Sequence, residues 1–123
     1  MASVIYVQTN GVDAPRRSAT PIYLASTAAA MDCEVGIYFT IDGCTLLKKG
    51  VAENLIVPKH DGNGAPLATF IRQALDLGVD FYVCQPSLDL HGLQHDDLID
   101  GVEMIGGAAF NDMALEADQV ICF

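Results

Sequence analysis

The chain has 123 residues, of which 51% are hydrophobic, and it carries a formal net charge of −10 at pH 7. This length predicts a single domain, spanning residues 1–123, that is large enough to bury its own core. The charge is uneven, because every Lys and Arg lies within residues 1–72, while residues 73–123 hold ten acidic residues and no Lys or Arg. Such an acidic half argues against nucleic acid and anionic membranes as partners, and it fits either a docking face for a basic protein or simple solubility.

Membrane, metal and nucleotide sites are not expected. No apolar run approaches the ~20 residues of a membrane span, and no basic segment precedes an apolar one at the N-terminus, so we expect a cytoplasmic protein. The four cysteines, Cys33, Cys44, Cys84 and Cys122, form no CxxC pair, which makes free thiols more consistent with the sequence than a zinc site or a disulfide framework. Neither a GxGxxG nor a GxxxxGK[ST] pattern is present, and we expect no cofactor.

The N-terminal part of the chain predicts a strand followed by a long helix. Residues 3–8 are apolar and rich in β-branched side chains, and a helix is expected from Pro15 to about Met31. Arg16 and Arg17 fall in the first turn of that helix, where cations oppose the helix dipole. They are either solvated side chains or a sign that positive charge is needed at this edge of the sheet.

A second strand is predicted over residues 34–41, followed by a turn and a short helix that begins at Cys44 and ends before Gly50. Cys33 precedes this strand and therefore falls at the opposite edge of the sheet. Residues 58–65 are rich in turn-forming residues and indicate a mobile loop. This loop is either a lid over the edge that carries Cys84 or a passive surface loop.

The stretch around Cys84 is the centre of the sequence. A helix with one buried face is predicted over residues 66–77, and Gly78 separates it from a buried strand that ends at Val83. Pro86 and Ser87 favour a helix directly after Cys84. The thiol thus lies where a strand ends and a helix begins, which is the edge where open α/β sheets bind ligands.

Cys84 has two interpretations at this stage. Helix N-termini favour anions and lower thiol pKa values, so Cys84 is a candidate for a reactive thiolate, with Arg16, Arg17, Ser87 and the backbone amides of Gln85 and Ser87 as supporting groups. A buried structural cysteine is the alternative. His91 and His95 are weaker candidates for a role.

The last part of the chain predicts two further strands, over residues 102–105 and 119–123, with a helix over residues 108–117 between them. Cys122 is expected in the core of the last strand. Strands and helices alternate throughout, which predicts a parallel sheet with helices on both faces.

The sequence resembles the DsrE/DsrF family of sulfur-relay proteins over nearly its whole length. The segments that carry the resemblance are Asp13-x-Pro15-x-Arg17, Phe39-Thr40-x-Asp42-Gly43-x-x-Leu46-Leu47-x-x-Gly50, Gly78-Val-x-x-Tyr82-Val-Cys84-x-x-Ser87-x-x-x-x-Gly92-Leu93, and Gly101-Val-Glu-x-Ile-Gly106. The resemblance implies a three-layer α/β/α fold with a five-stranded, mostly parallel, flavodoxin-like sheet. It also implies a homo-oligomer, either a trimer or a hexamer.

The resemblance further implies that Cys84 carries sulfur as a persulfide and passes it between protein thiols, as a sulfurtransferase would. Partners of such relays include TusA-like and rhodanese-like proteins. Two alternatives stay open: a thiol redox protein in which Cys84 and Cys44 form a reversible disulfide, and a non-catalytic assembly or binding subunit.

Overall fold

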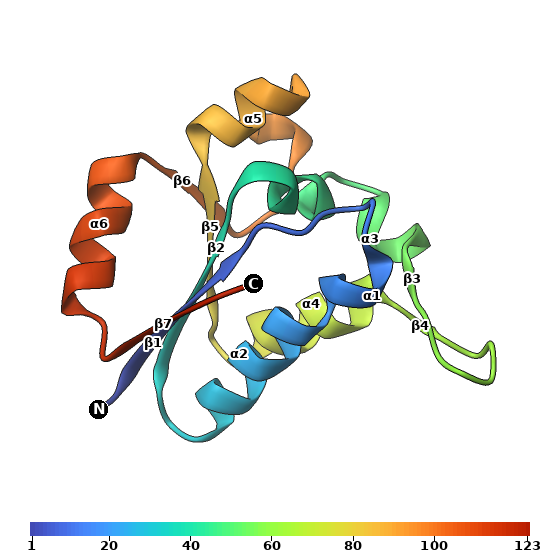
Figure 1. The fold of residues 1–123 in the computed structure, drawn as a ribbon, viewed down its shortest axis with the longest axis horizontal. Coiled ribbons are helices and arrows are strands. Elements are labelled where there is room, and N and C mark those ends of the chain that lie inside the picture. Colours follow the sequence, from blue (N-terminus) through green and yellow to red (C-terminus); the bar gives the residue numbers. More distant parts are fainter.

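A five-stranded parallel sheet separates two unequal layers of helices in the computed structural model, which describes residues 1–123 (Figure 1). The strands of this sheet are β1 (Ser3–Gln8), β2 (Glu34–Phe39), β5 (Asp80–Cys84), β6 (Val102–Ile105) and β7 (Gln119–Cys122). They lie in the order β6-β5-β2-β1-β7, and every neighbouring pair is parallel. The predicted three-layer parallel fold is confirmed. Its strand order, counted along the chain within this sheet, is 4-3-2-1-5 rather than the 2-1-3-4-5 of flavodoxin itself.

The connections between these strands are mostly helical. The helices are α1 (Pro15–Ser18), α2 (Thr20–Ala30), α3 (Val51–Asn54), α4 (Leu67–Asp76), α5 (Gln85–His91) and α6 (Gly107–Glu116), with 3₁₀ helices η1 (Ile41–Leu47) and η2 (His95–Asp97). A short antiparallel hairpin is formed by β3 (Ile56–Val57) and β4 (Ala65–Pro66). None of the helices has both the length and the apolar character that a membrane span requires.

The helix expected from Pro15 to Met31 is in fact two helices. α1 ends at Ser18, and α2 begins at Thr20 with Pro21 in its first turn. Pro21 has no N–H with which to continue a helix from the residues before it, so it is tolerated only near a helix start. The expectation of one long helix was therefore wrong at this point.

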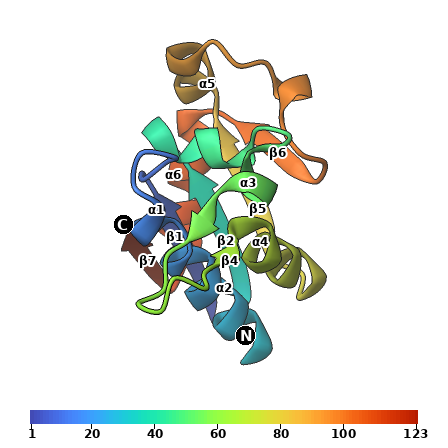
Figure 2. The same cartoon turned by 90° about the vertical axis from the view of Figure 1, so that its right-hand side faces the viewer.

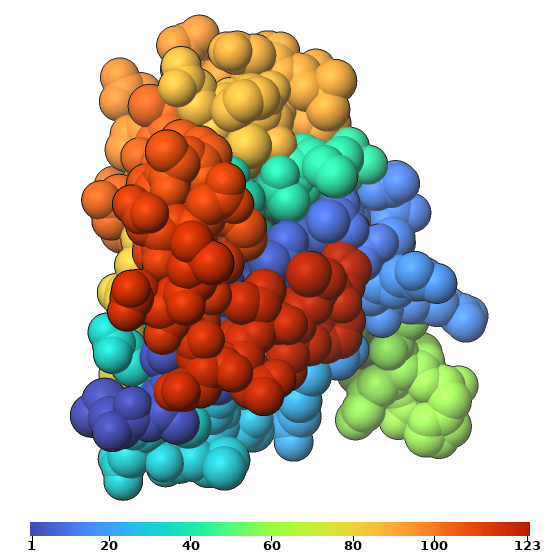
Figure 3. Space-filling view, turned by 60° about the vertical axis from the view of Figure 1, so that its left-hand side comes forward, coloured from blue at the N-terminus to red at the C-terminus, as the bar shows by residue number.

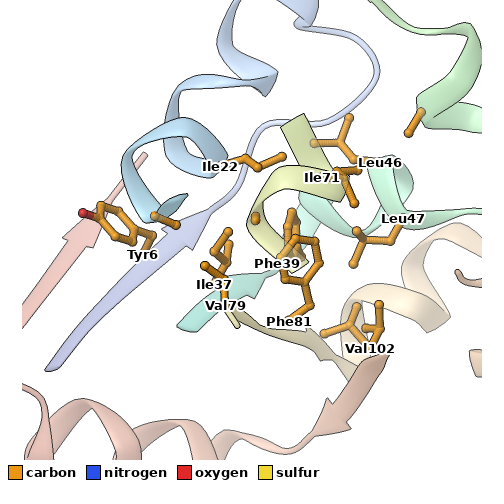
Figure 4. Close-up of a cluster of buried hydrophobic side chains, with 14 of the residues drawn as sticks. Tyr6, Ile22, Ile37, Phe39, Leu46, Leu47, Ile71, Val79, Phe81 and Val102 are labelled. Atoms are coloured by element: carbon orange, nitrogen blue, oxygen red, sulfur yellow. The ribbon is translucent and has the colours of Figure 1, made fainter. Parts of the chain in front are cut away.

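The two faces of the sheet are covered very differently. The face under α2 and α4 holds a cluster of 21 buried residues, in which the rings of Phe39 and Phe81 lie 5.2 Å apart (Figure 4). The face under α6 holds only three buried residues, Ile5, Val7 and Tyr38. Burial of apolar surface is the main source of stability, so the α2/α4 face carries most of the core while the α6 face is thin.

β7 is an edge strand and is exposed along its whole length, as the space-filling view shows beside α6 (Figure 3). Cys122 is therefore exposed, and its expected place in the core was wrong. The sequence of β7 has the apolar pattern of a buried strand. It stays exposed because α6 is the only helix over that face of the sheet and does not reach the edge that β7 forms.

The turn-rich loop of residues 58–64 closes the β3–β4 hairpin. The hairpin packs against α1, α3 and α4, and it lies away from α5 in both ribbon views (Figures 1 and 2). It does not cover the strand end that carries Cys84, so the passive surface loop is the description that fits.

Candidate functional site

Cys84 is the last residue of β5 and the residue that precedes the first turn of α5. Pro86 lies in that first turn, as expected, where its missing N–H is not needed by the helix. Cys84 also pairs in register with Ile105, the residue just before Gly106 and the start of α6. The thiol is half-buried at the C-terminal edge of the sheet, beside the beginnings of two helices.

Ser87 connects the Cys84 segment to the neighbouring strand. Its side chain is 5% exposed, and its Oγ accepts a hydrogen bond of 2.6 Å from the backbone N–H of Ile41 and lies 3.3 Å from Thr40 Oγ1. Ile41 has φ +56°, a left-handed conformation that is strained for a β-branched residue. The Ser87 hydroxyl therefore holds a strained turn at the end of β2 against the first turn of α5.

The neighbours of Cys84 change the acidity of its thiol. Burial alone raises the pKa of this thiol, but hydrogen bonds from the hydroxyls of Ser87, Tyr38 and Thr40 and from the Ser87 amide outweigh it. The pKa of Cys84 consequently lies below the ordinary thiol value. Donors that stabilise the charged form are a recognised way of producing a reactive cysteine.

Tyr38 is the main site residue that the sequence did not single out. It is buried on the α6 face of β2, and its ring stacks on Phe110 of α6 with 4.3 Å between centroids. Burial, the hydrogen bond to Cys84 and the charge of that thiol all raise the pKa of Tyr38. Tyr38 thus keeps its proton and remains a donor to the sulfur.

Strand pairing explains why Tyr38 and Thr40 reach this sulfur. β2 lies next to β5 with Phe39 opposite Val83, so side chains at the end of β2 that point to the α6 face approach Cys84 diagonally. The polar groups of Tyr38 and Thr40 near the end of the predicted second strand were the only sign in the sequence that this strand contributes to the site. They could not be linked to Cys84 until the two strands were known to be neighbours.

Cys44 occupies a position that looks similar in sequence but differs in its surroundings. Its side chain is fully buried in the α2/α4 core, and its S–H lies 3.4 Å from the carbonyl oxygen of Ile41 and 3.5 Å from that of Ser87. Burial raises the pKa of Cys44 to about 11, with smaller upward contributions from Cys84 and Asp42. At neutral pH this group is a protonated donor that joins η1 to α5. All four cysteines are free thiols.

The other candidate residues do not converge on Cys84. Arg16 and Arg17 are exposed on α1, which packs against α2 and β3 (Figures 1 and 2). The side chain of Gln85 is exposed, and the amide that hydrogen-bonds the sulfur is that of Ser87. The sequence predicted that the arginines lie at the same edge of the sheet as Cys84. It did not predict on which face of the sheet they lie.

The two histidines have structural contacts. His91 Nε2 lies 3.1 Å from Asp42 Oδ1, which makes a second connection between α5 and η1. His95 Nε2 donates to the carbonyl oxygen of Val102 at 2.7 Å. No group of three or more His, Cys, Asp and Glu side chains is placed to hold a metal ion.

Solved structures with the same fold are known. The structure of the ychN protein from E. coli covers 100% of both chains with a TM-score of 0.81 and 19% sequence identity. A protein of unknown function from Methanobacterium thermoautotrophicum covers 99% of this chain and 98% of its own, with a TM-score of 0.64 and 16% identity. At such low identities these likenesses establish the fold alone.

Three sequence relatives cover most of this chain at 26–30% identity. The chain is 28% identical to the sulfur carrier protein DsrE2 of Allochromatium vinosum, over 80% of this chain and 84% of that protein. It is 30% identical to an uncharacterized protein of Methanopyrus kandleri, over 87% and 82% of the two chains. An uncharacterized protein of Methanocaldococcus jannaschii is 26% identical over 85% of this chain, which spans only 36% of that longer protein.

A family model decides the assignment. The model of the DsrE/DsrF-like family matches residues 2–123, which is nearly the entire sequence and includes Cys84 and each residue that contacts its sulfur. The fold, the strand-end cysteine and this match agree, and the chain belongs to the DsrE/DsrF-like family.

Proposed function

We propose that this protein carries sulfane sulfur as a persulfide on Cys84 and relays it between protein thiols. Family membership and the likeness to the sulfur carrier of Allochromatium vinosum support a sulfur-relay role in general. The observation that favours Cys84 as the carrier is its half-buried place at the end of β5 and directly before α5, and the neighbouring hydroxyls and the Ser87 amide lower the pKa of the thiol there.

The proposed transfer consists of two thiol exchange steps. The Cys84 thiolate attacks the outer sulfur of a donor persulfide, a new S–S bond forms, and the donor leaves as its thiolate. An acceptor thiolate then attacks the outer sulfur of the Cys84 persulfide, and Cys84 leaves as the thiolate. Cys84 is the nucleophile in the first step and the leaving group in the second, and a lowered pKa favours its ionisation and its departure.

The donors around the sulfur have the same task in both steps. Tyr38, Thr40 and Ser87 stabilise negative charge on Cys84 before it attacks and again as it leaves. No second cysteine takes part in this scheme. Cys33 precedes β2 at the opposite edge of the sheet, and Cys122 lies on the exposed edge strand.

The redox alternative requires Cys44 to become a thiolate. Its complete burial, its hydrogen bonds to two carbonyl oxygens and its raised pKa of about 11 all disfavour that form. A non-catalytic assembly subunit is the other alternative, and the loading experiment below tests it directly.

An oligomer is part of the proposal. The exposed apolar side chains of β7 and α6, with Leu115 83%, Val120 39% and Ile121 38% exposed, favour burial between subunits. The family suggests a trimer or a hexamer of single-domain chains in the cytoplasm. Its partners would be TusA-like or rhodanese-like proteins. Light scattering at micromolar concentration tests it, and a stable monomer would reject it.

Loading with an inorganic polysulfide, followed by mass spectrometry of the peptide around each cysteine, tests the proposed chemistry. We expect one added sulfur atom on Cys84 and little on Cys33, Cys44 or Cys122. A Cys84–Cys44 disulfide without added sulfur would favour the redox alternative, and unmodified cysteines throughout would favour the binding subunit.

A further inference from the structure

A groove of about 530 Å³ lies on the α6 face, at the end of the sheet opposite to Cys84. It runs between α6 and the beginnings of β1, β2 and β5, and we call it the α6 groove; its lining includes Ile5, Gly36, Asp80, Tyr82, Met113 and Glu116. A Cβ at Gly36 would lie 3.0 Å from the ring of Tyr82, so a larger residue there would require that ring to shift. Figure 3 shows the N-terminal residues and the starts of β2 and β5 reaching the surface beside α6.

The α6 groove combines apolar side chains, among them Ile5, Tyr82 and Met113, with acidic groups. Glu34, Asp80 and Glu116 line it, and the only ion pair of the whole chain is the distant contact between His91 and Asp42. Burial raises the pKa of Asp80, and repulsion from Glu34 and Glu103 adds to the rise. The groove therefore gathers carboxylates that no Lys or Arg of this chain pairs with, and the N-terminal Met1 also lines it.

We propose that the α6 groove docks a segment of a partner protein that presents Lys or Arg beside an apolar side chain. The carboxylates offer charge complementarity to the cations, and the apolar side chains of the lining offer a contact for the neighbouring side chain. A bound metal ion is a poorer fit, because the acidic groups are not gathered into a coordinating cluster. A twofold contact between two copies of this chain would place the same acidic groove against itself, so a second copy could occupy it only through a different, basic surface.

The groove begins at the opposite end of the sheet but extends along β5 as far as Tyr82. Tyr82 lines it, and Cys84 follows two residues later on the same strand and the same face, roughly 7 Å further along. A docked segment would thus hold its protein beside Cys84, as a sulfur donor or acceptor must be held. This last link rests on the proposed function, whereas the occupancy of the groove does not.

A dye-labelled decapeptide of alternating Lys and Leu is a suitable probe, with Glu/Leu and Lys/Ser decapeptides as controls for charge and for the apolar contact. Binding is measured by fluorescence anisotropy at increasing salt, and its position by amide NMR shifts of the wild-type protein. We expect binding of the Lys/Leu peptide alone, weakening with salt, and shifts concentrated at Ile5, Gly36 and Tyr82.

A double variant, Glu34→Gln with Asp80→Asn, tests the charges, and Asp13→Asn with Glu53→Gln is its control because it removes the same charge from exposed sites outside the groove. We expect affinity to fall roughly fivefold in the first variant and less than about twofold in the second. Equal losses in both variants, or NMR shifts away from the groove, would overturn the proposal. Dissociation of the wild-type oligomer in the groove variant alone would also overturn it, in favour of a second copy as the occupant.

The same preparations separate this proposal from the proposed function. Polysulfide loading of Cys84 in the groove variant should match the wild type, because neither changed residue contacts the sulfur. Peptide binding without any loading of Cys84 would leave the docking groove in place and reject the sulfur carrier. Loading of Cys84 without peptide binding would reject the docking groove and leave the sulfur carrier in place.

Discussion

Cys44 and Cys84 follow neighbouring strands of one sheet, yet their surroundings shift the pKa values of their thiols in opposite directions. Cys84 is half-buried on the thin α6 face among hydroxyl donors, and its pKa is lowered. Cys44 is enclosed in the α2/α4 core, where burial raises its pKa to about 11 and the carbonyl oxygens of Ile41 and Ser87 accept from its S–H. Burial disfavours the thiolate at both cysteines, and only Cys84 has hydrogen-bond donors that outweigh it, so the neighbours of a cysteine matter more here than its place after a strand.

The largest expected effect concerns Cys44 and alkaline pH. Its raised pKa means that the native protein keeps a proton that the unfolded chain loses above about pH 9. The stability from this proton is fully present below that pH and is lost as the pH rises toward 11, by up to about 3 kcal/mol. Urea unfolding at several pH values should show a steeper alkaline loss in the wild type than in Cys44→Ser.

Cys33→Ser is the matched control for that comparison, because Cys33 lies before β2 at the other edge of the sheet. It should keep the alkaline slope of the wild type. Identical slopes in the wild type and in Cys44→Ser would show that Cys44 ionises as freely in the folded protein as in the unfolded chain.

Ser87→Ala should affect both stability and reactivity. It removes the acceptor for the Ile41 N–H and a donor to Cys84, so we expect a loss of about 1–3 kcal/mol in the free energy of unfolding and a higher pKa for Cys84. Thermal or urea unfolding and alkylation rates measured against pH are the readouts.

Ser26→Ala is the control for Ser87→Ala, since Ser26 is also buried but bonds only to the carbonyl of Ile22 within its own helix. It should lower stability less and leave the alkylation of Cys84 unchanged. Equal alkylation profiles in both variants would mean that the Ser87 hydroxyl does not act on the sulfur.

Tyr38→Phe is a more selective change. It removes the hydroxyl that donates to Cys84 while retaining a ring that stacks on Phe110. The pKa of Cys84 should rise, and its alkylation at neutral pH should slow a few-fold with little change in stability. Tyr23→Phe, on the exposed side of α2, should change neither quantity; a similar slowing in that control would contradict the role of Tyr38.

The smallest effect is expected from the arginines. Arg16→Ala and Arg17→Ala should leave polysulfide loading of Cys84 nearly unchanged, because both side chains are exposed on α1 and neither contacts the sulfur. Exposed charges contribute about 1 kcal/mol or less in any case. A severalfold slower loading rate would place these charges in the path of the sulfur donor.

Local sequence patterns predicted the features that depend on neighbouring residues alone, namely the alternation of strands and helices and the residues at their ends. Alternating strands and helices gave the parallel sheet, Gly78 separates α4 from β5 with φ +85°, and Pro86 places Cys84 at a helix start. The pattern also showed which edge of the sheet each strand end shares. It could not show which face a side chain would meet, so Arg16 and Arg17 were grouped with a thiol that they do not contact.

The other differences arise from strand order and from packing. Tyr38 and Thr40 reach Cys84 only because β2 and β5 are neighbours, and nothing in either segment alone states that pairing. Cys122 has the apolar neighbours of a core strand, but β7 lies at the edge of a face that one helix covers. Both facts become visible only when the whole sheet is assembled.

The central claim is that Cys84 carries the sulfur, and counting sulfane sulfur on the protein tests it most directly. Wild type, Cys44→Ser and Cys84→Ser are loaded with polysulfide, freed of excess reagent, and treated with cyanide, which removes sulfane sulfur as thiocyanate. We predict about one thiocyanate per chain from the wild type and from Cys44→Ser, and almost none from Cys84→Ser. If Cys84→Ser releases as much thiocyanate as the wild type, Cys84 is not the sulfur carrier.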